Sequence, residues 1–246
     1  MALAKVPELP VPGISTLTYS QPSLKELRAM QTPEQKRGTA YHEAGHAAMK
    51  FMFGTHYNIV HIDMQIHMRG TLAAAGEVRT AEPEEWIPVI ADFPPDVPSD
   101  LRSSYILAGK RSMMGYLAGY SAEHRLCPSE YGWLAKQLDM HGIDWDEDDR
   151  HDIHDMARAF RIAKRLHGDN DDAWRLLSQM AAWTDEALSH PKLWAVVVAL
   201  AEQLVAIKTR MGCKRVWGIM DNAWNEASVP CLQIGRKWRR RFPIGS

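Results

Sequence analysis

Two histidines and a glutamate lie close together in residues 34–53, a segment whose apolar side chains follow helical spacing. His42, Glu43 and His46 form the pattern His-Glu-x-x-His. Because residues four apart share one face of a helix, both imidazoles can reach the same metal ion. Neutral histidine nitrogens bind Zn²⁺, and a glutamate beside the metal can take a proton from a water that zinc activates. The pattern predicts zinc ligands at His42 and His46 and a general base at Glu43.

The same pattern can also arise by chance on a surface helix. Here it lies among small residues, which suit the helix to tight burial: Ala40, Ala44, Gly45, Ala47 and Ala48. Burial of an unliganded histidine pair costs free energy. The composition of this segment therefore favours metal binding over chance.

The residues around the motif resemble those of a known enzyme family. Residues 39–47 read Thr-Ala-Tyr-His-Glu-Ala-Gly-His-Ala. They resemble the zinc helix of the FtsH-type ATP-dependent metallopeptidases, in which His-Glu-Ala-Gly-His is followed by Ala. The similarity covers about residues 36–230 and is weak after residue 165.

Two further segments contribute to this resemblance. Residues 151–157 are similar to a segment in which the family has Asn-Asp-Ile or Asn-Asp-Leu, followed by an alanine. Residues 117–123 are similar to the family's Gly-Gly-Arg-x-Ala-Glu-Glu helix, although three residues depart from it: Ala118, Tyr120 and His124. In this helix Gly115, Gly119 and Ala122 are expected to permit close packing on the zinc helix.

The third zinc ligand must come from outside the histidine motif, and the resemblance implies that it is Asp152. In the helix predicted from about residue 147 to residue 167, Asp152 lies one turn before Met156, at the edge of the apolar face. A carboxylate in that place needs a partner, although it could instead stabilise the helix N-terminus. The sequence leaves other ligands open: Glu123, His124, His151 and Asp155.

Glu123 has a separate predicted role beside the metal. Its carboxylate could accept a hydrogen bond from a ligating histidine and so fix the orientation and tautomer of the ring. The alternative is an ordinary glutamate on a helix surface. Zinc is the only cofactor that the sequence predicts.

The elements that must position these residues are mostly helices. Further helices are expected at residues 105–126, 147–167, 173–189, 193–211 and 216–227, and extended segments at residues 59–65 and 72–80. With the resemblance, this predicts an α+β, mostly α-helical, zincin-like metallopeptidase domain with a small β-sheet and a C-terminal helical bundle. Residues 72–80 are the expected edge strand, on which an extended substrate would form backbone hydrogen bonds.

The predicted organisation is an N-terminal extension (1–35), the metallopeptidase-like domain (36–230) and a basic C-terminal tail (231–246). A formal net charge of -1 argues against a nucleic-acid partner. Apolar runs are too short for a membrane span. Three widely separated cysteines are typical of a reduced, cytoplasmic compartment.

The predicted function is that of a zinc metalloendopeptidase that hydrolyses peptide bonds. The resembling family carries an ATPase module, but this sequence has no Walker A loop, so peptides and unfolded protein segments are the expected substrates. Further expected partners are a second copy of the chain or a separate ATPase. The alternative is a catalytically inactive binding or regulatory protein with the same fold, against which the intact Glu43 argues.

Overall fold

The computed structural model describes residues 32–69, 72–81, 93, 96–127, 155–207 and 210–227. Its helices are α2 (Pro33–Met52), α3 (Ser99–Leu126), α5 (Asp155–His167), α6 (Asn170–Leu188), α7 (Pro191–Ala206) and α8 (Cys213–Glu226), with the 3-10 helix η1 (His56–Asn58). Its strands are β1 (Ile59–Arg69), β2 (Leu72–Thr80) and β3 (Arg210–Gly212). The expectation of a mostly helical α+β fold is therefore confirmed. Most of the predicted extension and all of the predicted basic tail lie outside the described residues.

Helix α2 begins at Pro33 because the residues around its first turn satisfy its free amides. Thr32 Oγ1 accepts a hydrogen bond from the amide of Gln35 (3.2 Å), and Gln35 Oε1 accepts one from the amide of Thr32 (2.9 Å). Proline is favourable at the first helical position, where no amide donor is needed. These contacts fix the start of the helix that carries His42, Glu43 and His46.

Helices α2 and α3 run antiparallel and approach closely. His42 meets Glu123 near the end of α3, whereas the ring of Phe53, just after α2, lies under Arg111, much earlier in α3. A Cβ atom added at Gly45 would overlap the carbonyl oxygen of Ala118. The glycine therefore permits a separation of the two backbones that a side chain would prevent.

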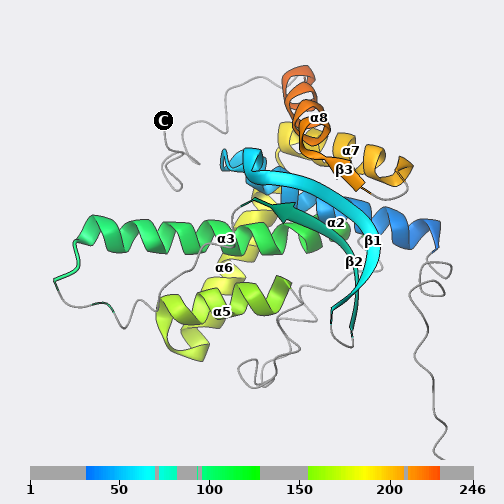
Figure 1. Cartoon of the computed structure of the whole chain (residues 1–246). Coiled ribbons are helices and arrows are strands. Elements are labelled where there is room, and N and C mark those ends of the chain that lie inside the picture. The colour runs from blue at the N-terminus through cyan, green and yellow to red at the C-terminus, as the bar shows by residue number, and fades with distance from the viewer. Residues whose placement is uncertain are drawn as a thin grey trace, which may run out of the picture.

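The strands form one antiparallel sheet in the order β2-β1-β3. Figure 1 shows β1 and β2 as a long curved ribbon beside α2, with α7 and α8 on one side of α2 and α3 and α5 on the other. In the β1–β2 register Asp63 pairs with Glu77 and Ile66 with Ala75, so two residues of β1 stand opposite Gly76. Within the described residues β2 lies at the edge of the sheet, as predicted for residues 72–80.

The prediction of a continuous helix over residues 193–211 was wrong at its end. Helix α7 ends at Ala206, and residues 210–212 form β3, in which Met211 pairs with Ile62 of β1. Met211 is 2% exposed, so burial against the sheet outweighs a helical pattern in this short segment. Lys36 Nζ donates hydrogen bonds to the carbonyls of Val205 (2.8 Å) and Ile207 (3.1 Å), which stabilises the helix end.

Other helix boundaries follow capping residues that periodicity does not reveal. Helix α6 begins at Asn170 because Asp169 Oδ1 accepts hydrogen bonds from the amides of Asp171 (2.8 Å) and Asp172 (3.1 Å). Helix α3 begins at Ser99, earlier than the predicted residue 105, and has no side-chain cap. Among the described helices, none combines the length and apolar character that crossing a membrane requires.

Candidate metal centre

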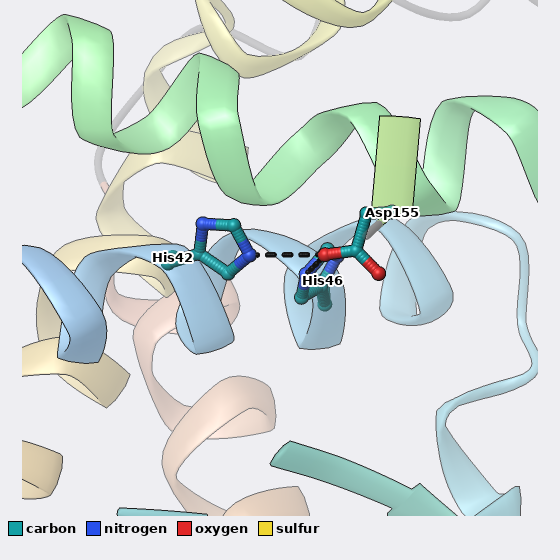
Figure 2. Close-up of side chains that lie close together, drawn as sticks. All are labelled: His42, His46 and Asp155. Carbon is teal, nitrogen blue, oxygen red and sulfur yellow. Dashed lines mark hydrogen bonds and ion pairs between the residues drawn. The ribbon is translucent and has the colours of Figure 1, made fainter. Parts of the chain in front are cut away.

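Three side chains from two helices converge on one point. His42 and His46 extend from the same face of α2, and Asp155 is the first residue of α5 (Figure 2). Asp155 Oδ2 lies 3.1 Å from His42 Nε2 and 3.0 Å from His46 Nε2. The side chains are 14%, 12% and 21% exposed for His42, His46 and Asp155. One atom from each residue can thus contact a common ion, since these atoms lie within 4.8 Å of one another.

The donor set and spacing fit zinc. Zinc prefers histidine nitrogen and carboxylate oxygen in tetrahedral arrangement, and bonds of about 2.0–2.2 Å place neighbouring ligand atoms roughly 3.3–3.6 Å apart. The 3.0 and 3.1 Å separations at Asp155 are a few tenths of an ångström shorter than this. A small adjustment of the side chains would accommodate the ion.

The outer nitrogens of both rings have their own partners. His46 Nδ1 lies 2.7 Å from the carbonyl oxygen of Gly115, which can only accept, so Nδ1–H is the donor. Glu123 Oε2 lies 3.3 Å from His42 Nδ1, as expected for a carboxylate that orients a ligating ring. With Nδ1 protonated, a neutral ring directs the lone pair of Nε2 toward Asp155. Each Nε2–Oδ2 contact then needs a positive charge between the atoms, either a proton or a metal ion.

The charged groups around the histidines strengthen the requirement for a proton or a metal ion between the rings and Asp155. Burial alone would lower the pKa of His42, but hydrogen bonds to Asp155 and Glu123 raise it well above its ordinary value. Burial alone would raise the pKa of Asp155, but His46 and His42 hold it well below its usual range. Together with Glu43, three carboxyl groups surround two imidazoles, which is a favourable environment for a divalent cation.

The described residues place Asp155 beside both histidines, and Asp152 as the third ligand stays a prediction. Asp152 lies outside the described residues, as does His151, so their placement is not described. Asp155 was one of the alternatives that the sequence left open, and it lies just before the buried Met156. In the helix predicted over residues 147–167, Asp152 and Asp155 are three residues apart and would share a similar face, so the sequence pattern alone could not separate them. Another alternative, His124, is exposed.

Glu43 lies beside the ligands rather than among them. It is 4% exposed, and burial raises its pKa to about 7 against the opposing effect of His42 and His46. A carboxyl group with this pKa can both accept and release a proton near neutral pH.

Tyr120 is a neighbour of the site to which sequence reasoning gave no role. Its ring contacts the His42 ring edge to face, with the ring centroids 4.8 Å apart. Burial, together with the nearby Asp155, Glu123 and Glu43, raises the pKa of its phenol, so the hydroxyl stays protonated. The sequence did contain one signal for this role, because Tyr120 stands where the resembling family has a different residue.

The glycines of α3 leave room for the ligands. A Cβ atom at Gly119 would lie 2.5 Å from His42 Nε2. Ala122 lies against Gly45, as predicted for close packing. Gly115 differs from this prediction: a Cβ atom there would meet nothing within 4 Å, and its contribution is instead the carbonyl that binds His46.

No protein-family model matches the chain, and the search of curated proteins found no relative.

Proposed function

We propose that this protein is a zinc-dependent metallopeptidase of zincin-like fold that hydrolyses peptide bonds in peptides or unfolded protein segments. His42, His46 and Asp155 are the proposed ligands. The main support is that two Nε2 atoms, whose rings have partners at Nδ1, face one carboxylate oxygen at 3.0 and 3.1 Å. This arrangement needs a proton or a metal ion between the atoms, and its donor set suits zinc.

The chain's own residues would supply binding and proton transfer. When bound, zinc supplies Lewis-acid chemistry: it lowers the pKa of a bound water and polarises a carbonyl group. Glu43 would take a proton from the attacking water at its carboxylate and pass it to the nitrogen of the leaving amine as the C–N bond breaks. Glu123 and the Gly115 carbonyl hold the two rings in orientation through Nδ1.

The described residues favour a catalytic site over a structural one. A structural zinc site is usually closed by four protein ligands, whereas a catalytic site keeps one position open. The described residues offer three ligands, with a buried carboxyl group at Glu43 beside them. A catalytically inactive binding protein would have no need for that buried carboxyl group.

The edge strand β2 supports peptides as substrates. Its Gly76 lies directly over Glu43, so an extended chain paired with β2 would pass close to the proposed base. Pairing of this kind uses backbone hydrogen bonds and requires an extended substrate. Folded proteins would therefore be poor substrates.

The proposal is tested by metal content and proteolysis together. We expect about one zinc ion per chain and chelator-sensitive digestion of an unfolded protein. Glu43→Gln should abolish digestion but keep zinc, since Glu43 is not a ligand. Glu34→Gln makes the same change on an exposed part of α2 and should alter neither. Zinc-loaded wild-type protein without activity on peptides or unfolded proteins would contradict the proposed function.

A further inference from the structure

The edge strand β2 passes over Glu43 at a single glycine. A Cβ atom built on Gly76 would lie 2.5 Å from Glu43 Oε1 and 2.8 Å from Glu43 Cγ. Such distances do not occur between a real Cβ atom and its neighbours. The backbone of β2 can therefore lie on this carboxyl group only because residue 76 has no side chain.

The backbone at Gly76 also differs from the rest of the strand. Its φ angle is +86°, in the region that favours glycine. The register shift between Asp63 and Ile66 places two residues of β1 opposite Gly76. Such a bulge bends a strand and redirects it locally. Here the irregularity lies at the point where β2 contacts Glu43 of α2.

Thr39, one turn before Glu43 in α2, contacts the same glycine. Its Cγ2 methyl would be 2.8 Å from a Cβ atom at position 76, and its hydroxyl donates a hydrogen bond to the carbonyl of Gln35 (3.0 Å). That hydrogen bond fixes the side chain, so the methyl group points toward β2. Glu43 is 4% exposed and Thr39 is 8% exposed.

We propose that Gly76 is a positioning residue for Glu43: together with the Thr39 methyl group, the β2 backbone holds this carboxyl group in one orientation beside the two histidines and excludes water from its outer side. The inference deepens the proposed function, because it rests on Glu43 as the base. It also links the strand expected to bind substrate directly to the group that moves the proton.

A cycle of stability measurements tests the contact without any activity. Gly76→Ala is compared in the wild-type and Glu43→Ala backgrounds, since Glu43→Ala removes both Glu43 atoms that the new Cβ atom would meet. Gly54→Ala is the matched control, because Gly54 has a φ angle of +72° but nothing within 4 Å of the position that a Cβ atom would take. We expect Gly76→Ala to lower Tm by about 5 °C more in the wild-type background than in the Glu43→Ala background. Gly54→Ala should lower Tm equally in both.

Equal losses of Tm for Gly76→Ala in the two backgrounds, or failure to fold in both, would overturn the inference. Folding of Gly76→Ala only in the Glu43→Ala background would support it. Because this cycle measures stability alone, it remains decisive if the wild-type protein cleaves no substrate.

Turnover gives a second readout if the wild-type protein is active. Thr39→Ser removes the methyl group but keeps the hydroxyl, and Thr184→Ser is its control, since Thr184 is buried and donates the same kind of hydrogen bond to Met180 (2.8 Å). We expect Thr39→Ser to lower kcat about threefold or more at unchanged zinc content, by loosening Glu43. An unchanged kcat, in a protein that Glu43→Gln inactivates, would refute the inference and leave the proposed function standing.

Discussion

The contact between α2 and α3 differs from the packing of α7 in the size of the side chains it buries. At the first contact Gly45 lies against Ala118 and Ala122, and Gly119 lies against the His42 ring. In α7 the side chains that are 0 or 1% exposed are mostly large: Leu193, Val196, Val197, Leu200 and Leu204. The first region brings two backbones close together, whereas the second removes a large apolar area from water.

This difference separates the sources of stability in the molecule. Full burial of a leucine or valine contributes about 1.5–3 kcal/mol, and alanine and glycine contribute much less. The close approach at Gly45 and Gly119 therefore gains less from the hydrophobic effect than α7 does, and the carboxylates and imidazoles beside it interact through their charges. We expect the region around His42 to depend on the metal for its stability and α7 to be indifferent to it.

Removal of zinc should have the largest effect and should be confined to one region. At a free zinc concentration of about a thousand times Kd, binding stabilises the folded state by roughly 4 kcal/mol, so chelation should lower Tm by about 10 °C. Amide hydrogen exchange should accelerate in α2, α3 and the start of α5, and remain slow in α7. Equal acceleration in α7 would show that the two regions do not differ in the way proposed.

A cavity introduced in α7 should have the next largest effect on the unfolding free energy, and this effect should not depend on zinc. Leu200 is 0% exposed, and Leu200→Ala should cost about 3 kcal/mol of unfolding free energy through lost burial and a cavity. Denaturant titration with and without zinc should give the same loss if the packing of α7 against α2 does not transmit the change at the metal site. A loss that changes by more than about 1 kcal/mol on chelation would indicate coupling between the regions.

A single methyl group added at the α2–α3 contact should lower stability by weakening zinc binding. Gly119→Ala places a Cβ atom 2.5 Å from His42 Nε2, so we expect zinc affinity to fall roughly 10- to 100-fold and the zinc-loaded protein to lose about 2 kcal/mol. Gly218→Ala, on α8 with nothing near the new atom, is the control and should raise stability by about 0.8 kcal/mol through helix propensity. Unchanged zinc affinity in Gly119→Ala would show that α3 is not shaped around His42.

The metal-free protein should become less stable as pH rises through neutrality. Folding raises the pKa of His42 well above 6.5 and that of Glu43 from 4.5 to about 7. Both groups bind more protons in the folded than in the unfolded state between these values, so stability falls with pH, on the order of 1 kcal/mol from pH 6 to pH 8. Zinc binding releases such protons, so the gain in Tm from zinc should grow over the same range. A metal-free Tm that rises from pH 6 to pH 8 would contradict these shifts.

The parts of the site that depend on local spacing could be predicted from the sequence. His42 and His46 are four residues apart, so helical geometry alone brings both rings to one face and places Glu43 beside them. The Glu123 carboxylate lies at His42 Nδ1, the position that its predicted orienting role requires. The first arrangement follows from a regular helix, whereas the second joins α2 to α3 and follows from the ordinary need of a ligating histidine for an acceptor at its other nitrogen.

The parts that depend on distant contacts could not be predicted. The position of Asp155 beside both rings is set by the packing of α5 on α3, and its sequence neighbours offer several carboxylates at similar spacing. Strand β3 has three residues and is stabilised by pairing with β1, which no local pattern reveals. The contact of Gly76 with Glu43 likewise requires β2 to bend over α2.

The proposed ligand set is best tested by the zinc affinity of two aspartate variants. Asp155→Asn and Asp152→Asn make the same change three residues apart, and zinc per chain is measured for each after equilibration with a competing chelator. If His42, His46 and Asp155 form the zinc site, Asp155→Asn weakens zinc binding by at least about 100-fold and Asp152→Asn retains about one zinc ion per chain. Retention of zinc by Asp155→Asn together with its loss from Asp152→Asn would contradict this set of ligands.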